Sequence, residues 1–189
     1  LAHVLRVFQD EMVPHEKGSV DPLRDLEDVE TELILSDLVV VEKRLERLEK
    51  DRKKIKNPEL DQEYELLVRC KAALEENKPL RGLEFTAEEE KRIRGFQFLS
   101  LKPVLYVLNL GEADAPRMAE IEKEYREGPL ANRPKTAVTA VCGKIEAELA
   151  ELAPEEAKEY LASYGLSESG LVRLISATYS LLGLMSFLT

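Results

Sequence analysis

The sequence is poor in the residues that usually build metal sites, disulfides and nucleophilic centres. Its 189 residues include only two cysteines and two histidines. Cys70 and Cys142 lie far apart without ligand spacing, which argues against a zinc site or disulfide framework and favours a reducing cytoplasm. His3 precedes a strand-like run, His15 lies in a polar loop, and neither has a Ser or Cys nucleophile at a recognisable spacing. We therefore expect structural or surface roles for both histidines, and no catalytic or metal-binding residue in this chain.

Long apolar runs and an N-terminal leader are also missing. No apolar run is long enough to span a bilayer, and residues 1–8 have neither a basic start nor a small-residue cleavage site. The chain lacks an initiator methionine and starts almost directly on a strand-like run, and residues 185–189 form another such run. We interpret the sequence as part of a longer cytoplasmic protein that does not enter a membrane.

The residues that are present describe a globular protein rich in exposed helix. Apolar residues make up 44% and charged residues 34% of the chain, and the apolar residues are periodic, which argues against disorder. The length suits one domain, with or without an insertion. A net charge of −10 argues against a surface covered with basic residues that bind nucleic acid. Residues 43–56 are an exception, because they contain eight basic and only three acidic side chains.

Apolar periodicity predicts a helical arm between two strands. Residues 4–8 read as a strand, and helices are expected at residues 21–56, 59–76 and 86–99. The first helix has an apolar seam with steps of three, four and three, formed by Leu38, Val41, Leu45 and Leu48. Because an Asn-Pro pair at residues 57–58 breaks the pattern, the first two helices should form an antiparallel hairpin.

The second half of the sequence alternates strands and helices. Strands are expected at residues 104–108 and 136–141, and helices at residues 115–127, 145–152, 154–164 and 169–182. This order is typical of an α/β fold with a parallel sheet and right-handed crossovers. We divide the chain into a strand and loop at residues 1–20, a coiled-coil insertion at 21–101, and the rest of the sheet domain at 102–189.

Polar and small residues follow the two buried strands where parallel sheets place their ligand contacts. Asn109 and Glu112 come after the first of these strands, and Cys142, Gly143 and Lys144 come after the second. Either loop alone could be an ordinary turn, since Asn and Gly suit turn geometry. Their occurrence in this order on consecutive strands is a stronger indication of a binding site.

Several segments together resemble the YchF/Obg-like ATPase family over essentially the whole chain. They are the His-x-x-Gly-x-Val-Asp-Pro motif at residues 15–22 and residues 28–38, 98–103, 145–152 and 164–171. The resemblance implies that the chain is part of a Ras-like P-loop NTPase domain with a coiled-coil arm. It further implies a monomeric parent protein that hydrolyses ATP, and GTP less well, and that associates with ribosomes. It also implies that the phosphate-binding loop, the Mg²⁺ ligands and the switches lie upstream of residue 1, with a TGS domain beyond residue 189.

The resemblance assigns both loops to the nucleotide base. In hydrolases of this type, an Asn-Lys-x-Asp loop binds guanine, and the Asp accepts two hydrogen bonds from the base. Here Leu110 replaces the Lys, and Glu112, one methylene longer, replaces the Asp. We therefore expect Asn109, Leu110 and Glu112 to contact the base with a preference for adenine. Cys142, Gly143 and Lys144 match the small loop beside the base.

Other interpretations stay open. The basic segment at residues 43–56 could be a solvated helix face, or it could contact ribosomal RNA through Lys43, Arg47, Lys50 and Lys54. Cys142 reads as a small buried side chain or as a redox-sensitive thiol at the base. The protein as a whole could instead be a GTP-specific hydrolase, or a helical-hairpin interaction module without a nucleotide. Without a phosphate loop, the chain alone should bind ATP weakly and not hydrolyse it.

Overall fold

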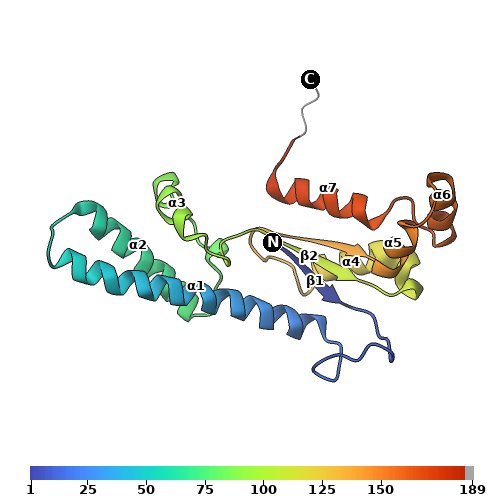
Figure 1. Cartoon of the computed structure of the whole chain (residues 1–189), viewed down its shortest axis with the longest axis horizontal. Helices are drawn as coiled ribbons and strands as arrows, with labels where there is room; N and C mark the ends of the chain where they lie inside the picture. Colours follow the sequence, from blue (N-terminus) through green and yellow to red (C-terminus); the bar gives the residue numbers. More distant parts are fainter. Residues whose placement is uncertain (186–189) are drawn as a thin grey trace. The chain divides into compact units, whose positions relative to one another are not determined.

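The computed structural model describes residues 1–185 and divides into two compact units (Figure 1). The first unit combines Leu1–Leu26 with the chain from Pro103 onward, and the second is Glu27–Lys102. The divisions expected from the sequence lie near residues 21 and 101, close to these boundaries. Of the strand-like run expected at residues 185–189, all but Met185 lies outside the described residues.

The first unit is built on a parallel three-stranded sheet in the order β1-β2-β3. The strands are β1 (Ala2–Arg6), β2 (Val104–Asn109) and β3 (Thr136–Val141). The central strand β2 is an apolar run whose first five residues are all buried. The expected strand at residues 4–8 is displaced by two positions, because pairing with β2 already begins at Ala2. The sheet confirms the predicted α/β class.

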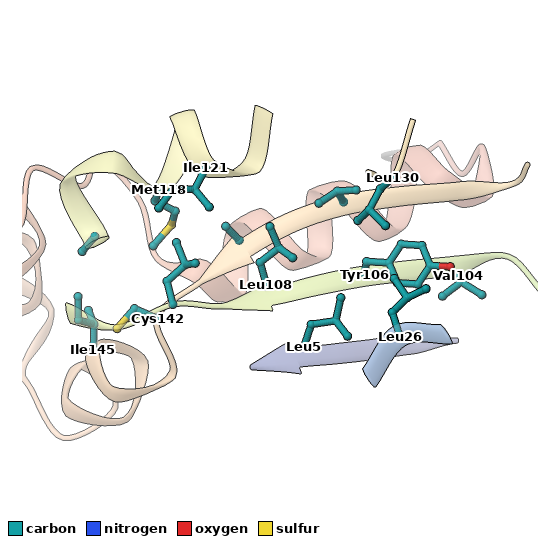
Figure 2. Packing of buried hydrophobic residues seen from close by; sticks show 14 residues of the cluster. Leu5, Leu26, Val104, Tyr106, Leu108, Met118, Ile121, Leu130, Cys142 and Ile145 are labelled. Carbon is teal, nitrogen blue, oxygen red and sulfur yellow. The ribbon is translucent and has the colours of Figure 1, made fainter. Parts of the chain in front are cut away.

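Helices of the first unit cover the sheet and enclose one apolar core (Figure 2). They are η3 (Glu112–Arg117), α4 (Met118–Glu127), α5 (Gly143–Leu149), α6 (Pro154–Ser163) and α7 (Gly170–Leu182). Leu5 and Leu108 of the strands pack in this core with Ile121 of α4 and Ile145 of α5. Each such side chain contributes about 1.5–3 kcal/mol on full burial. The helix expected from residue 115 begins as the 3-10 helix η3, which contains Pro116.

Two carboxylates join α7 to neighbouring elements of the first unit. Glu146 accepts hydrogen bonds from the backbone N–H groups of Gly170 (2.6 Å) and Leu171 (3.3 Å) at the start of α7. A Cβ atom at position 170 would lie 2.9 Å from a methyl carbon of Val141, so this close approach requires glycine. Glu122 of α4 accepts from the Ala140 N–H of edge strand β3 (3.1 Å) and from Arg173 of α7 (2.5 Å).

The helical arm belongs largely to the second unit and contains the expected antiparallel hairpin (Figure 1). It comprises α1 (Pro22–Arg52), α2 (Pro58–Glu75), η1 (Leu80–Gly82), α3 (Ala87–Ile93) and η2 (Arg94–Phe96). Ion pairs join the two long helices, namely Arg44–Glu63 (2.7 Å), Arg52–Asp61 (2.5 Å) and Lys71–Glu42 (3.0 Å).

Two helices of the arm end several residues earlier than the sequence predicts. The first ends at Arg52 and is followed by a turn, in which the N–H groups of Lys54 and Ile55 both bind the Asp51 carbonyl at 3.0 Å. The third α-helix ends at Ile93 and continues only as the short 3-10 helix η2. Gln97 then takes a left-handed conformation (φ 54°), which stops helical growth before the expected residue 99.

The buried seam of α1 contains two acidic residues that periodicity did not reveal. Asp37 is 2% exposed and accepts hydrogen bonds from the backbone N–H groups of Leu99 (2.8 Å) and Ser100 (2.7 Å). Leu38, which the sequence analysis put on the seam, is only partly buried. Glu30 is buried as well and forms an ion pair with Arg81 of η1. These carboxylates replace apolar contacts with specific hydrogen bonds between the arm's segments.

Candidate functional site

A cavity of about 570 Å³ opens in the first unit where β1 and β2 end and α5 begins. It is lined by residues 7–10, 109–114, 143 and 144. Parallel strands place ligand contacts at their carboxyl ends, so this position in the fold is suited to a small molecule. The cavity brings together the two loops that the sequence analysis assigned to one site.

Asn109 at the end of β2 connects the two loops. Its side-chain oxygen accepts a hydrogen bond of 3.0 Å from the backbone N–H of Gly143. Because a backbone N–H can only donate, the oxygen must face Gly143, and the amide Nδ2 group has no hydrogen-bond partner within residues 1–185. A Cβ atom at Gly143 would lie only 3.2 Å from that oxygen. The side chain of Asn109 is therefore fixed with a donor to offer to a ligand.

Glu112 is held by two side chains from later parts of the chain. Its Oε2 atom accepts from the Nζ group of Lys144 at 2.5 Å, and its Oε1 atom accepts from the hydroxyl group of Tyr164 at 3.2 Å. The hydrogen bond from Lys144 lowers the pKa of Glu112 against the opposing effect of burial, and the same bond raises the pKa of Lys144. Tyr164 cannot be recognised as a site residue from the sequence, because a contact across 52 residues leaves no local pattern.

Leu110 and Cys142 pack mainly into the apolar core. They are 2% and 1% exposed and belong to the core cluster, where Figure 2 shows the Cys142 side chain. Leu110 also lines the cavity, whereas Cys142 is not among the described residues that do so. From the sequence we expect Cys142 beside the base, whereas in the structure its side chain packs in the core. The thiol is also nearly inaccessible, as a small buried apolar side chain would be.

His15 fixes the loop between β1 and α1 to the first turn of that helix. Its Nδ1 atom accepts from the Lys17 N–H (3.1 Å), so Nε2 carries the hydrogen that faces Asp25 Oδ2 (2.8 Å). Arg24 binds the other oxygen of Asp25 at 2.8 Å and the carbonyl of Ser19 at 2.8 Å. Burial alone would raise the pKa of Asp25, but its bonds to Arg24 and His15 together lower it.

The arm carries a basic stripe, defined here as Lys43, Arg47 and Lys50 of α1 with Lys54 in the following turn. All four side chains are exposed, and none forms an ion pair within residues 1–185. The helical members are spaced by four and three residues, so they lie on one face over about 10 Å. Neighbouring Arg44 and Arg52, in contrast, are paired with acids of α2.

The described residues present neither a cluster of metal ligands nor a membrane-spanning helix. Within residues 1–185, no cluster of three or more His, Cys, Asp or Glu side chains is placed to hold a metal ion. None of the helices in that range is both long and apolar enough to cross a membrane.

Known proteins resemble the chain over its whole length, although no protein-family model matches it. The "Ribosome-binding ATPase YchF" of Bacillus subtilis (strain 168) is 42% identical over 194 residues, which cover 100% of this chain and 51% of that protein. The protein of the same name from Escherichia coli O157:H7 is 37% identical over 191 residues, again with 100% and 51% coverage. "Obg-like ATPase 1" of Oryza sativa subsp. indica is 33% identical over 192 residues, with 99% and 47% coverage.

The chain belongs to the YchF/Obg-like ATPase family. The solved structure of the Schizosaccharomyces pombe YchF GTPase superimposes with a TM-score of 0.79 at 29% identity, over 96% of this chain and 49% of that one. This match confirms the predicted Ras-like fold with its helical insertion. The chain spans about half the length of the YchF relatives that it matches.

Proposed function

We propose that the protein is a ribosome-associated nucleotide hydrolase that prefers ATP, and that this chain supplies its base-binding loops and its arm. One observation carries the proposal. The Asn109–Gly143 hydrogen bond joins the loops after β2 and β3 over a cavity of about 570 Å³. The names of the bacterial YchF relatives, which describe ribosome-binding ATPases, support the same function.

The chemistry of the cavity favours a purine without requiring guanine. The Nδ2 group of Asn109 can donate a hydrogen bond to N7, an acceptor that adenine and guanine share. Selection of guanine would need a carboxylate that accepts from its N1–H and amino groups. Glu112 is already engaged by Lys144 and Tyr164, so adenine fits the site at least as well.

A hydrolase of this class also needs a phosphate site and Mg²⁺. Within residues 1–185, no cluster of three or more His, Cys, Asp or Glu side chains is placed to hold that metal. We propose that the full-length gene product contributes those groups from outside these residues. The role of the present chain is to bind and orient the base.

The proposal is tested by titrating the full-length gene product with ATP and with GTP in a calorimeter. Asn109→Ala should lower the affinity for both nucleotides about tenfold, because it removes a ligand contact and the bond between the loops. Gln62→Ala, which removes an exposed amide of the arm, serves as the matched control and should leave both affinities unchanged. An unchanged affinity in Asn109→Ala would favour a helical-hairpin module. Tighter binding of GTP than ATP by the wild type would favour the GTP-specific alternative.

We further propose that the basic stripe contacts ribosomal RNA. Its charges are not neutralised within the described residues and can therefore displace counterions from phosphates. Reversal of Lys43, Arg47 and Lys50 to Glu should weaken co-sedimentation with ribosomes. It should also reduce the slope of log affinity against log salt by about two, if each side chain contacts one phosphate of single-stranded RNA.

The matched control for the stripe reverses the same number of exposed lysines elsewhere, namely Lys91, Lys123 and Lys158. This variant has the same net charge as the stripe variant, so it corrects for the overall field of the protein. Equal loss of binding in the two variants would contradict a specific role for the stripe. We also infer a monomeric cytoplasmic protein, which light scattering and cell fractionation can check.

A further inference from the structure

Glu112 is one of three acidic residues that line the cavity, together with Asp10 and Asp114, and both of its oxygens accept hydrogen bonds from within the protein. Lys144 of α5 binds one oxygen at 2.5 Å. Tyr164, which directly follows α6, binds the other at 3.2 Å. The three residues come from three segments that are separated by up to 52 positions in the sequence. Their contacts form a clamp, defined here as Glu112, Lys144 and Tyr164.

Tyr164 is itself held in place. Its ring contacts the ring of Tyr160 edge-on, with 5.2 Å between the centroids, and the Tyr160 hydroxyl donates to Glu148 of α5. Both tyrosine rings also pack against the core of the first unit. The hydroxyl group of Tyr164 therefore meets Glu112 from a fixed ring, and little conformational entropy is lost when the bond forms.

The clamp has a chemical consequence for any purine in the cavity. Guanine presents an N1–H and an amino group, which need a free carboxylate, whereas adenine presents a lone pair at N1. The carboxylate of Glu112 already accepts hydrogen bonds from Lys144 and Tyr164, and its negative charge is balanced by the ammonium group of Lys144. A released carboxylate would attract the guanine donors and repel the lone pair of adenine at N1.

We propose that Tyr164, together with Lys144, is a positioning residue that sets base preference by holding Glu112 away from guanine recognition. The inference rests on the proposed nucleotide-binding function and deepens it. Tyr164 does not line the described cavity and acts only through Glu112. Its effect should therefore appear in the choice between ATP and GTP rather than in nucleotide binding as such.

The test uses the full-length gene product and measures calorimetric dissociation constants for ATP and for GTP. Tyr164→Phe keeps the ring and removes only the hydroxyl group, and Lys144→Met keeps most of the stem and removes the charge. The double variant should lower the ratio of ATP to GTP affinity about tenfold, and Tyr164→Phe alone about threefold. In a Glu112→Ala background, Tyr164→Phe should leave the ratio unchanged, because the group that it positions is gone.

The controls separate positioning from structural damage. Tyr64→Phe removes a hydroxyl of the arm that binds Glu49 rather than Glu112, and it should leave the ratio unchanged. An unchanged ratio in the double variant, or equal losses for ATP and GTP, would overturn the inference while the proposed function stands. Wild-type protein that binds neither nucleotide would overturn the proposed function, and the inference with it.

Discussion

Removal of the Glu30 carboxylate should destabilise the arm far more than removal of a similar carboxylate at its surface. The side chains of Glu30 and Arg81 are 8% and 1% exposed, and Arg81 donates to both oxygens of Glu30. Arg81 also donates to the carbonyl of Ser100 at 3.3 Å, while its Nε atom is buried without a partner among the described residues. In Glu30→Ala, a guanidinium group would thus remain buried without its counter-charge.

The expected cost follows from that burial. Breaking a buried ion pair by removing one partner costs about 3–5 kcal/mol. With a urea m-value of about 2 kcal/mol/M, the unfolding midpoint should fall by about 2 M. Glu63→Ala is the matched control, because Glu63 also binds an arginine, Arg44, at 2.7 Å, but in a partly exposed pair. It should cost about 1 kcal/mol or less.

Urea denaturation of the full-length protein, followed by far-ultraviolet circular dichroism, measures both variants. The double variant Glu30→Met with Arg81→Met removes both charges at similar volume and should recover most of the stability lost in Glu30→Ala. If Glu30→Ala and Glu63→Ala cost the same, the reasoning from burial is refuted. If the double variant is no more stable than Glu30→Ala, the loss does not come from an uncompensated charge.

Three further outcomes are expected. Gly143→Ala should weaken ATP binding about threefold or more in calorimetry, since its Cβ would lie 3.2 Å from Asn109 Oδ1, and an unchanged affinity would contradict the fixed geometry. The pKa of Glu112 is lower in the folded protein than in the unfolded chain, so its ion pair with Lys144 stabilises the fold at pH values above the unfolded-state pKa. This stabilisation is lost as the pH falls through the folded-state pKa of Glu112. The thermal midpoint of wild type should therefore exceed that of Glu112→Gln at neutral pH and approach it below about pH 4, whereas a constant difference would exclude this linkage. The 189-residue chain alone should show no low-micromolar ATP affinity by calorimetry and no phosphate release.

Local pattern was sufficient to predict the elements that are held by regular apolar burial. The strand at residues 136–141 is found with the predicted bounds, and β2 extends the predicted strand by one residue, to Asn109. The break between α1 and α2 was visible because the Asn57 side chain caps α2 (2.9 Å to the Glu59 N–H) and Pro58 begins it. In these places, each residue and its neighbours in the sequence are enough to determine the backbone conformation.

Local pattern failed where a carboxylate binds a distant partner. Asp37 takes a buried position on the arm's seam because it caps two backbone N–H groups more than 60 residues later in the chain. Periodicity treats such an acid as exposed, so the seam was assigned to Leu38. Tyr164 was missed for the same reason, because only the folded chain brings it to Glu112. The strand loops of the candidate site were predictable, but the side chain that steadies them was not.

This use of acids also changes the meaning of the net charge of −10. Glu30, Asp37, Glu122 and Glu146 serve as acceptors for internal arginines and backbone N–H groups, so they do not act as free surface charges. In the basic stripe, by contrast, no cation has an ion-pair partner within residues 1–185. Because salt at physiological concentration screens charges beyond a Debye length of about 8 Å, a nearby phosphate group is attracted by these local cations more than it is repelled by the net charge of the protein. An acidic protein of this construction can therefore present a surface that attracts RNA.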